Sequence, residues 1–214
     1  MGQDFKARHQ WSEGQLAEDA LKVRRKHGYR DNTLSFDILD CLTKLTFTRS
    51  VPVKYFELTD AADPAYVKFN PLELHIAREI RRSAEDGNGY ARLVVAHEIA
   101  HLRLHSDGVN SFSPFNDHEE RWFIKEQSVE WQANTWALYF LLPNAIVEML
   151  RSTDAIVEMC NVDPSTASMR LAQIQDRENR QAMAGLCSEC GSFNLICEGQ
   201  IMRCGTCGST TRRG

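Results

Sequence analysis

The segment from Tyr90 to His105, YARLVVAHEIAHLRLH, most constrains what this chain can fold into. It is apolar on nearly every side, which predicts a helix buried in the core. Within it, His97 and His101 are four residues apart, so one helical turn places both rings on the same face. The core is therefore expected to form around a helix that carries polar chemistry.

The pattern His-Glu-x-x-His at positions 97 to 101 has the spacing of a zinc-dependent hydrolase. Two histidines on one helix face can both direct a ring nitrogen at one ion. Glu98 is too close to the first histidine to coordinate well, but it can reach a water on the metal. Zinc lowers the pKa of that water to about 7, and the carboxylate can accept its proton as it attacks a carbonyl. The pattern predicts His97 and His101 as zinc ligands and Glu98 as the general base.

A catalytic zinc of this kind needs a third protein ligand and an open fourth position. Asp107 lies six residues after His101, but the metzincin spacing that would use it requires glycine at position 104, where this chain has Leu104. His105 is one turn further along the helix and is expected to cap it or to lie at the surface. Neither residue is favoured as the third ligand.

Two glutamates remain, Glu126 and Glu130, on a long helix predicted from about Glu119 to Leu142. They are four residues apart on one face, so periodicity alone does not separate them. HEIAHLRLH followed by VEWQANTWALYFLLP resembles the ImmA/IrrE family of zinc metallopeptidases, over about residues 12–174. The resemblance implies that Glu130 is the gluzincin-like third ligand and that Glu126 is a solvated or outer acid.

Other side chains could assist this site. Asn134 lies one turn after Glu130, and it either orients a ligand histidine or is an ordinary amide on the helix face. Tyr90, His118 and Tyr139 could stabilise an oxyanion, although each is expected to be structural or exposed.

The remaining segments predict an α+β fold. A capping box at Ser12 begins a helix that ends near Gly28, and a second helix is expected from Ser35 to about Leu45. VPVKYFEL, AYVKF and LELHIA predict a small antiparallel sheet. By the resemblance, this sheet packs on the His-Glu-x-x-His helix in a zincin-like metallopeptidase core, with a helical C-terminal part.

This ImmA/IrrE-like domain is expected to span residues 1–180. It includes a helix-turn-helix-like pair at about 154–176, with a turn at Asn161 and Val162 and with Asp163 as the cap of the second helix. The pair has few basic residues, so it favours packing or substrate docking over reading DNA.

Five of the seven cysteines fall between positions 187 and 207. Two Cys-x-x-Cys knuckles, each followed by glycine, predict a closed tetrahedral site for a structural zinc and hence a zinc ribbon over 186–214. The odd cysteine count and the absence of an export signal argue against disulfides. Cys197 is expected to be a small buried hydrophobe. The predicted ligands of the structural zinc are Cys187, Cys190, Cys204 and Cys207.

The net charge of −4 argues against a general electrostatic grip on nucleic acid. After Leu186, three arginines against two glutamates support nucleic-acid binding only weakly, and protein docking by the ribbon is favoured. The N-terminus has no apolar run, and no stretch approaches the ~20 apolar residues of a membrane span. A cytoplasmic protein without a membrane partner is expected.

Together these features predict a zinc-dependent endopeptidase with one catalytic and one structural zinc. Its pocket is expected between the two ligand helices, and its substrate is expected to lie as an extended strand beside the sheet edge. The resemblance implies a protein regulator as substrate, such as a helix-turn-helix repressor of a phage, mobile element or stress response. The alternatives are a non-catalytic regulator that acts through the ribbon and the helical pair, and hydrolysis of a non-peptide amide.

Overall fold

The computed structural model describes residues 4–59, 63–107, 124–184, 186–187, 190, 192–198 and 201–212. The chain divides into two compact units, Met1–Leu171 and Ala172–Gly214. In the part of the chain that is described, no helix is long and apolar enough to cross a membrane.

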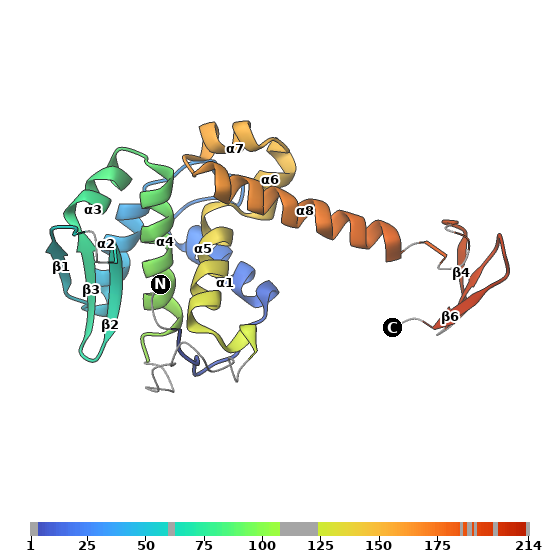
Figure 1. Cartoon of the computed structure of the whole chain (residues 1–214), viewed down its shortest axis with the longest axis horizontal. Helices are drawn as coiled ribbons and strands as arrows, with labels where there is room; N and C mark the ends of the chain where they lie inside the picture. Colours follow the sequence, from blue (N-terminus) through green and yellow to red (C-terminus); the bar gives the residue numbers. More distant parts are fainter. Residues whose placement is uncertain are drawn as a thin grey trace. The chain divides into compact units, whose positions relative to one another are not determined.

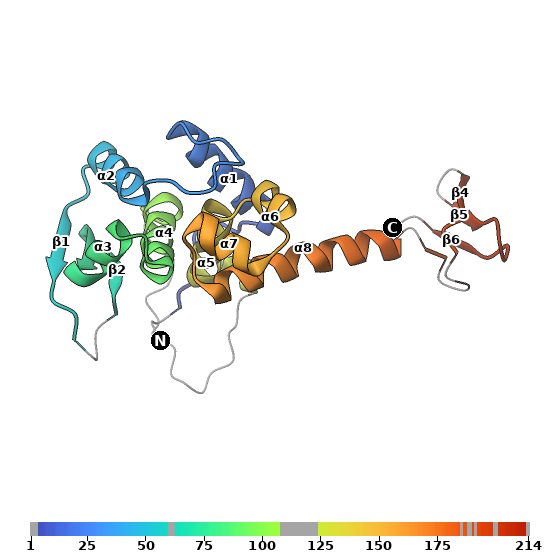
Figure 2. The same cartoon turned by 90° about the horizontal axis from the view of Figure 1, so that it is seen from above.

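The first unit combines helices with one small sheet, as predicted for an α+β fold. In Figures 1 and 2, α4 lies between the sheet and α5, which places the His-Glu-x-x-His helix at the centre of this unit. The helices are α1 (Glu13–Lys26), α2 (Ile38–Arg49), α3 (Arg78–Glu85), α4 (Gly89–Leu104), α5 (Val129–Leu141), α6 (Asn144–Leu150), α7 (Thr153–Cys160) and the start of α8 (Pro164–Ala184), with a 3-10 turn η1 (Lys125–Gln127) before α5.

The sheet is mixed, so the prediction of a purely antiparallel sheet is wrong. Its strands are β1 (Val53–Phe56), β2 (Ala65–Phe69) and β3 (Leu72–Ala77), in the order β1-β3-β2. β2 pairs with β3 antiparallel, but β1 pairs with β3 parallel. The most apolar strand, β3, takes the central position, and its Leu74 and Ile76 are completely buried. As a result β2 is left as the edge strand that faces α4.

Several helix ends differ from the predicted ones. The capping box at Ser12 is present, but α2 begins at Ile38 because the Asp37 side chain accepts a hydrogen bond from the Asp40 N–H. The helix predicted from Glu119 begins instead at Val129. The Ser128 hydroxyl accepts from the N–H of Trp131 at 2.9 Å, which caps α5 there. Positions 119–123 lie outside the described residues.

The predicted helical pair is present as α7 and α8. Asn161 turns the chain in the left-handed conformation (φ 52°), and Asp163 caps α8 through the N–H of Thr166 at 3.0 Å. The start of α4 packs closely on this turn, because a Cβ on Gly89 would lie 2.3 Å from backbone atoms of Val162 and Asp163. Glycine at position 89 therefore allows α4 to approach the pair.

Two completely buried arginines hold the C-terminal end of α5. Arg24 on α1 donates to the carbonyl of Phe140 at 2.6 Å, and Arg170 on α8 donates to the carbonyl of Leu142 at 3.1 Å. The last carbonyls of a helix have no partner within it, so these bonds satisfy groups that would otherwise be buried without one. The C-terminus of α5 is thus fixed to two other helices.

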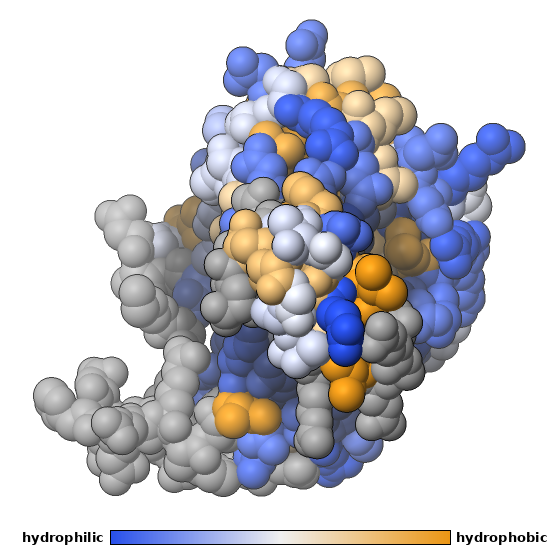
Figure 3. Space-filling model, turned by 90° about the vertical axis from the view of Figure 1, so that its right-hand side faces the viewer, coloured by the Kyte–Doolittle hydropathy of each residue, from blue (hydrophilic) through white to orange (hydrophobic). Residues whose placement is uncertain are grey.

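The second unit contains a three-stranded antiparallel sheet of β4 (Leu195–Glu198), β5 (Ile201–Cys204) and β6 (Thr210–Arg212). Strand β4 lies between the two knuckles, β5 ends at Cys204 and β6 follows the second knuckle. Phe193, Ile196 and Ile201 are exposed. On the face shown in Figure 3, hydrophobic residues lie in separate patches among hydrophilic ones.

Candidate metal centre

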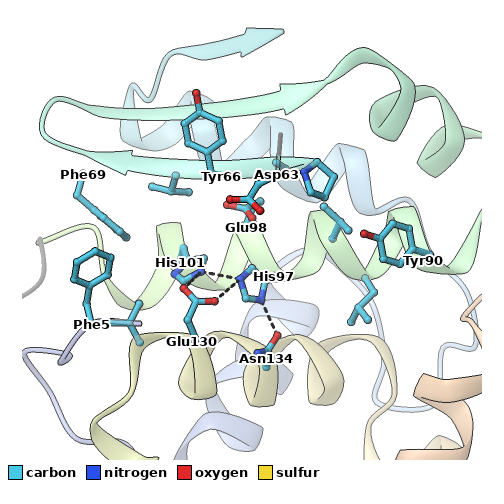
Figure 4. Close-up of a pocket in the computed structure, with 16 residues that line it drawn as sticks. Phe5, Asp63, Tyr66, Phe69, Tyr90, His97, Glu98, His101, Glu130 and Asn134 are labelled. Carbon is cyan, nitrogen blue, oxygen red and sulfur yellow. Dashed lines mark hydrogen bonds and ion pairs between the residues drawn. The ribbon is translucent and has the colours of Figure 1, made fainter. Parts of the chain in front are cut away.

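Helix α4 directs its two histidines toward α5. Its N-terminus is capped by Asn88, whose side chain accepts from the N–H of Ala91 at 3.0 Å. Apolar residues such as Ile99 and Ala100 bury the helix on its other sides. Figure 4 shows His97 and His101 on the face of α4 that meets Glu130.

The two histidines and Glu130 converge on one point. Their ligand atoms all lie within 4.8 Å of one another. The Nε2 atoms of His97 and His101 are 2.8 Å apart, and they lie 3.3 Å and 3.5 Å from the Glu130 carboxylate. Tetrahedral ligands about 2.1 Å from a zinc ion lie about 3.4 Å from one another. The two histidine–carboxylate separations match this value, and the two Nε2 atoms would have to move about 0.6 Å apart to hold the same ion.

Asn134 lies where it can orient His97. Its Oδ1 is 2.9 Å from Nδ1 of His97, so the amide oxygen can accept the proton of that nitrogen and leave Nε2 free as a ligand. Both Asn134 and Glu130 come from α5, one turn apart. Of the two roles that the sequence left open for Asn134, this contact favours the orienting role.

Glu98 lies on the opposite side of His97 from Asn134, between α4 and β2 (Figure 4). The side chain is almost fully buried, and its Oε2 has no hydrogen-bond partner in the structure. Burial raises the pKa of Glu98 to about 7, and the nearby Glu130 adds to this, while His97 and a backbone hydrogen bond with Val67 oppose it. A carboxyl with a pKa near neutrality can exchange a proton at working pH.

The two histidines differ in their electrostatic surroundings. Burial, together with neighbouring His97 and His105, holds the pKa of His101 well below its ordinary value. Burial also lowers the pKa of His97, but the Glu130 and Glu98 carboxylates raise it by more. His101 is therefore neutral at physiological pH and presents a lone pair, which is the form that binds a metal.

A cleft of about 610 Å³ contains these residues. Its walls come from α4, the start of α5, strand β2 and the N-terminal segment. Phe5 and Phe69 lie at one end, beside His101, and Tyr90 lies at the other (Figure 4). The pocket predicted between the two ligand helices is present, and the sheet edge forms one of its walls.

The structure separates the other ligand candidates from this cluster. The backbone carbonyl of Glu126 accepts from Gln132, and its side chain pairs with Lys125 rather than with the histidines. Asp107 is also outside the cluster. His105 caps α4 as one prediction had it, but it is 3% exposed, so the alternative of a surface position is wrong.

The three oxyanion candidates also differ in position. Tyr90 is exposed and lines the cleft. Tyr139 donates to Glu13 at 2.8 Å and lies under the guanidinium of Arg170, away from the residues that line the cleft. His118 lies outside the described residues.

The four knuckle cysteines form a second cluster, in the second unit. Their sulfurs lie within 4.8 Å of one another, with Cys187 and Cys207 3.5 Å apart and Cys190 and Cys204 3.7 Å apart. Four sulfurs about 2.3 Å from one zinc would lie about 3.8 Å apart. Gly208 after the second knuckle has φ +76°, as the tight turn requires, whereas Gly191 and the side chain of Cys197 lie outside the described residues.

Sequence reasoning missed several residues that line the cleft. Asp63 and Phe69 come from the segments around β2, and Phe5 comes from the N-terminal segment. No motif marks them, because each joins the site through the tertiary fold. The edge-strand prediction was the one signal that pointed to the residues of β2.

The geometry defines an α+β unit with a candidate two-histidine, one-carboxylate metal centre and a separate candidate site of four cysteines. The family model of the IrrE N-terminal-like domain, Peptidase_M78, matches residues 55–157, a range that includes both ligand helices. This match supports the ImmA/IrrE family and, with it, a metallopeptidase.

A solved structure titled "Mycobacterium tuberculosis transcriptional regulator" is also similar, with a TM-score of 0.50 and 19% sequence identity. The similarity covers 73% of this chain and 46% of that chain, so this chain spans about half the length of that protein. At this identity the similarity concerns the fold alone. No curated protein matches the chain.

Proposed function

We propose that this protein is a zinc-dependent endopeptidase, in which His97, His101 and Glu130 hold the catalytic zinc and Glu98 is the general base. The observation that carries the proposal is the convergence of the three ligand atoms within 4.8 Å, beside a buried carboxyl. A purely structural zinc site has no use for that carboxyl. The histidine–carboxylate separations of 3.3 and 3.5 Å and the donor set of two imidazoles and a carboxylate fit zinc.

Zinc, when bound, acts as a Lewis acid that acidifies a water and polarises a carbonyl group. The protein's own residues have separate tasks. Asn134 holds His97 in the orientation that exposes Nε2, and Glu98 accepts a proton from the attacking water and passes it to the leaving amine. In the metal-free protein, burial raises the pKa of Glu98 to about 7, which makes this side chain a better proton acceptor than an exposed carboxylate.

The substrate is proposed to lie along β2 as an added strand. β2 is at the edge of its sheet, and Ala65, Val67 and Phe69 line the cleft. An extended peptide can pair with the free backbone groups of such an edge. A peptide bound in this way would lie between β2 and the two histidines, because both line the same cleft.

The second unit is proposed to be a zinc ribbon. The separations of its sulfurs, 3.5 and 3.7 Å, suit a tetrahedral four-sulfur site, which has no open position and is therefore structural. The backbone supports this site in the same way at both knuckles. The N–H of Cys187 donates to the carbonyl of Ser192, and the N–H of Cys204 donates to that of Ser209, each at 2.8 Å.

A transcriptional regulator is the proposed substrate, for example a helix-turn-helix repressor. The support is indirect: the similar solved structure is titled a transcriptional regulator, and the family resemblance implies such substrates. The alternative is a non-catalytic regulator that acts through the ribbon and through α7 and α8. Phe193, Ile196 and Ile201 are exposed on the second unit, which favours protein docking there.

The decisive experiment compares new protein N-termini in cells that express the wild type, Glu98→Gln or Glu126→Gln. Glu98→Gln preserves shape but removes the proton acceptor, so it should retain fold and zinc and lose cleavage by at least 1,000-fold, about 4 kcal/mol of transition-state stabilisation. Glu126→Gln, which changes an acid outside the cluster, should cut the same protein as the wild type. Biological activity that survives Glu98→Gln would favour the non-catalytic regulator.

A further inference from the structure

The N-terminal segment, residues 4–11, runs across the start of α5, more than 110 residues away in sequence. Lys6 pairs with Ser128 as an isolated antiparallel bridge. The N–H of Ala7 donates to the carbonyl of Gln127 at 2.8 Å, and the N–H of Val129 donates to the carbonyl of Phe5 at 3.0 Å. This contact fixes the segment at the helix end that carries Glu130.

The first three N–H groups of α5 all find partners, and two of these partners come from this segment. Val129 donates to the carbonyl of Phe5, as above. Glu130 donates to Oδ1 of Asp4 at 3.2 Å, and Trp131 donates to the hydroxyl of Ser128 at 2.9 Å. The free N–H groups of a helix start are normally satisfied by one capping residue and by water. Here the carboxylate of Asp4, which is distant in sequence, accepts from the backbone N–H of Glu130, the proposed metal ligand.

Asp4 holds this helix end with both of its oxygens. Oδ2 accepts from the hydroxyl of Ser128 at 2.7 Å, and Oδ1 accepts from the backbone of Glu130. The carboxylate also lies at the positive end of the helix dipole, where a negative charge is favourable. Ser128 is 1% exposed, so its hydroxyl would otherwise be buried with few alternatives to this acceptor.

We propose that Asp4 is a positioning residue for Glu130, so that the N-terminal segment is a functional part of the metal centre. The proposal rests on the proposed function only in taking Glu130 as a metal ligand. Without Asp4, the first turn of α5 frays more readily, and fraying displaces the Glu130 side chain relative to His97 and His101. The carboxylate lies 3.3 and 3.5 Å from the two histidine nitrogens, so a shift of about 1 Å removes the fit to one ion.

The test measures zinc affinity, not peptidase activity. Zinc is titrated into the full-length protein against a chelator, and the isotherm of a His97→Ala/His101→Ala variant identifies the contribution of the cysteine site. Asp4→Ala should weaken binding at the histidine site by about 5- to 10-fold, because losing an acceptor at a helix start costs of order 1 kcal/mol. Asp4→Asn, which keeps one acceptor oxygen, should have a smaller effect.

Asp37→Ala is the matched control, because the Asp37 carboxylate also accepts from a backbone N–H at a helix start, that of α2, but lies outside the metal cluster. It should lower stability by about 1 kcal/mol and leave zinc affinity unchanged. Combining Asp4→Ala with Glu130→Ala tests whether Asp4 acts through Glu130. If it does, Asp4→Ala has no further effect on zinc affinity once Glu130 is absent.

The proposal is overturned if folded Asp4→Ala and Asp4→Asn bind zinc within twofold of the wild type. It is also overturned if Asp37→Ala weakens zinc equally, or if Asp4→Ala has the same effect with and without Glu130. Failure of the peptidase proposal has a different signature, since it appears as biological activity that survives Glu98→Gln. The zinc titration is unaffected by that result.

Discussion

The buried carboxyl of Glu98 gives a quantitative prediction for stability in the metal-free protein. Burial is the main cause that raises the pKa of Glu98 from its ordinary value of 4.5 to about 7. This shift means that ionising the carboxyl costs about 3 kcal/mol more in the folded protein than in the unfolded chain. Between these values the folded protein binds more protons than the unfolded chain. Stability from this group is therefore present below about pH 4.5 and is lost as the pH rises to 7.

Glu98→Gln removes this titration while keeping the shape of the side chain. The quantity to compare is the free energy of unfolding of the metal-free variant minus that of the metal-free wild type. This difference should be about 3 kcal/mol larger at pH 8 than at pH 4.5. Both proteins retain His101 and His105, so the titration of those residues cancels in the comparison, whereas His97 loses the carboxylate that raises its pKa, and the difference includes that coupling. Glu158→Gln, which makes the same change at an exposed position on α7, is the matched control.

The assay is urea unfolding in the presence of EDTA, followed by tryptophan fluorescence. All four tryptophans, at positions 11, 122, 131 and 136, belong to the first unit, so the signal does not report on the cysteine-rich unit. A stability difference between wild type and Glu98→Gln that stays the same from pH 4.5 to 8 would refute the reasoning. It would mean that solvent reaches the carboxylate and that burial does not control its ionisation.

Three further predictions concern separate contacts. Asn134→Leu should weaken zinc at the histidine site by 10- to 100-fold in a chelator titration, because His97 loses the acceptor at Nδ1. Gly89→Ala should lower the free energy of unfolding by about 1 to 3 kcal/mol, since its Cβ would lie 2.3 Å from the backbone of Val162. Its control is Gly14→Ala on α1, where the Cβ meets nothing within 4 Å. That change should raise the free energy of unfolding by about 0.5 to 1 kcal/mol. Cys204→Ser should remove one of two zinc ions per chain by elemental analysis and leave the histidine-bound zinc in place. The first prediction is contradicted if Asn134→Leu leaves zinc affinity unchanged, and the second if Gly89→Ala and Gly14→Ala change stability equally. The third is contradicted if Cys204→Ser leaves the zinc count unchanged.

The parts of the site that are local in sequence could be predicted from sequence. His97, Glu98 and His101 lie within five residues, and the geometry of one helical turn brings the two histidines together. Glu130 was different, because Glu126 has the same periodicity. The choice between them depends on how α4 and α5 pack, which single-sequence patterns do not encode. The family resemblance favoured Glu130, and the structure brings that residue to the histidines.

The errors in the fold have a similar origin. The composition of β1 to β3 predicted three strands, but the order of strands depends on the path of the connection between β1 and β2. One long helix was expected from about Glu119, yet Ser128 caps α5 and starts it later. No local sequence pattern marks Asp4, because the residues that it contacts, Ser128 and Glu130, lie 124 and 126 positions further along the chain.

The anchoring of α5 at both ends has a thermodynamic consequence for metal uptake. Asp4 at one end, and Arg24 and Arg170 at the other, order this helix as part of domain folding. The conformational entropy of arranging Glu130 is then lost before any ion arrives, and binding there buries little new apolar surface, so its heat capacity change is small. The proposed zinc ribbon would instead fold as it binds its ion, with a large negative heat capacity change. Calorimetry on one chain would therefore record two distinct signatures for two ions of the same element.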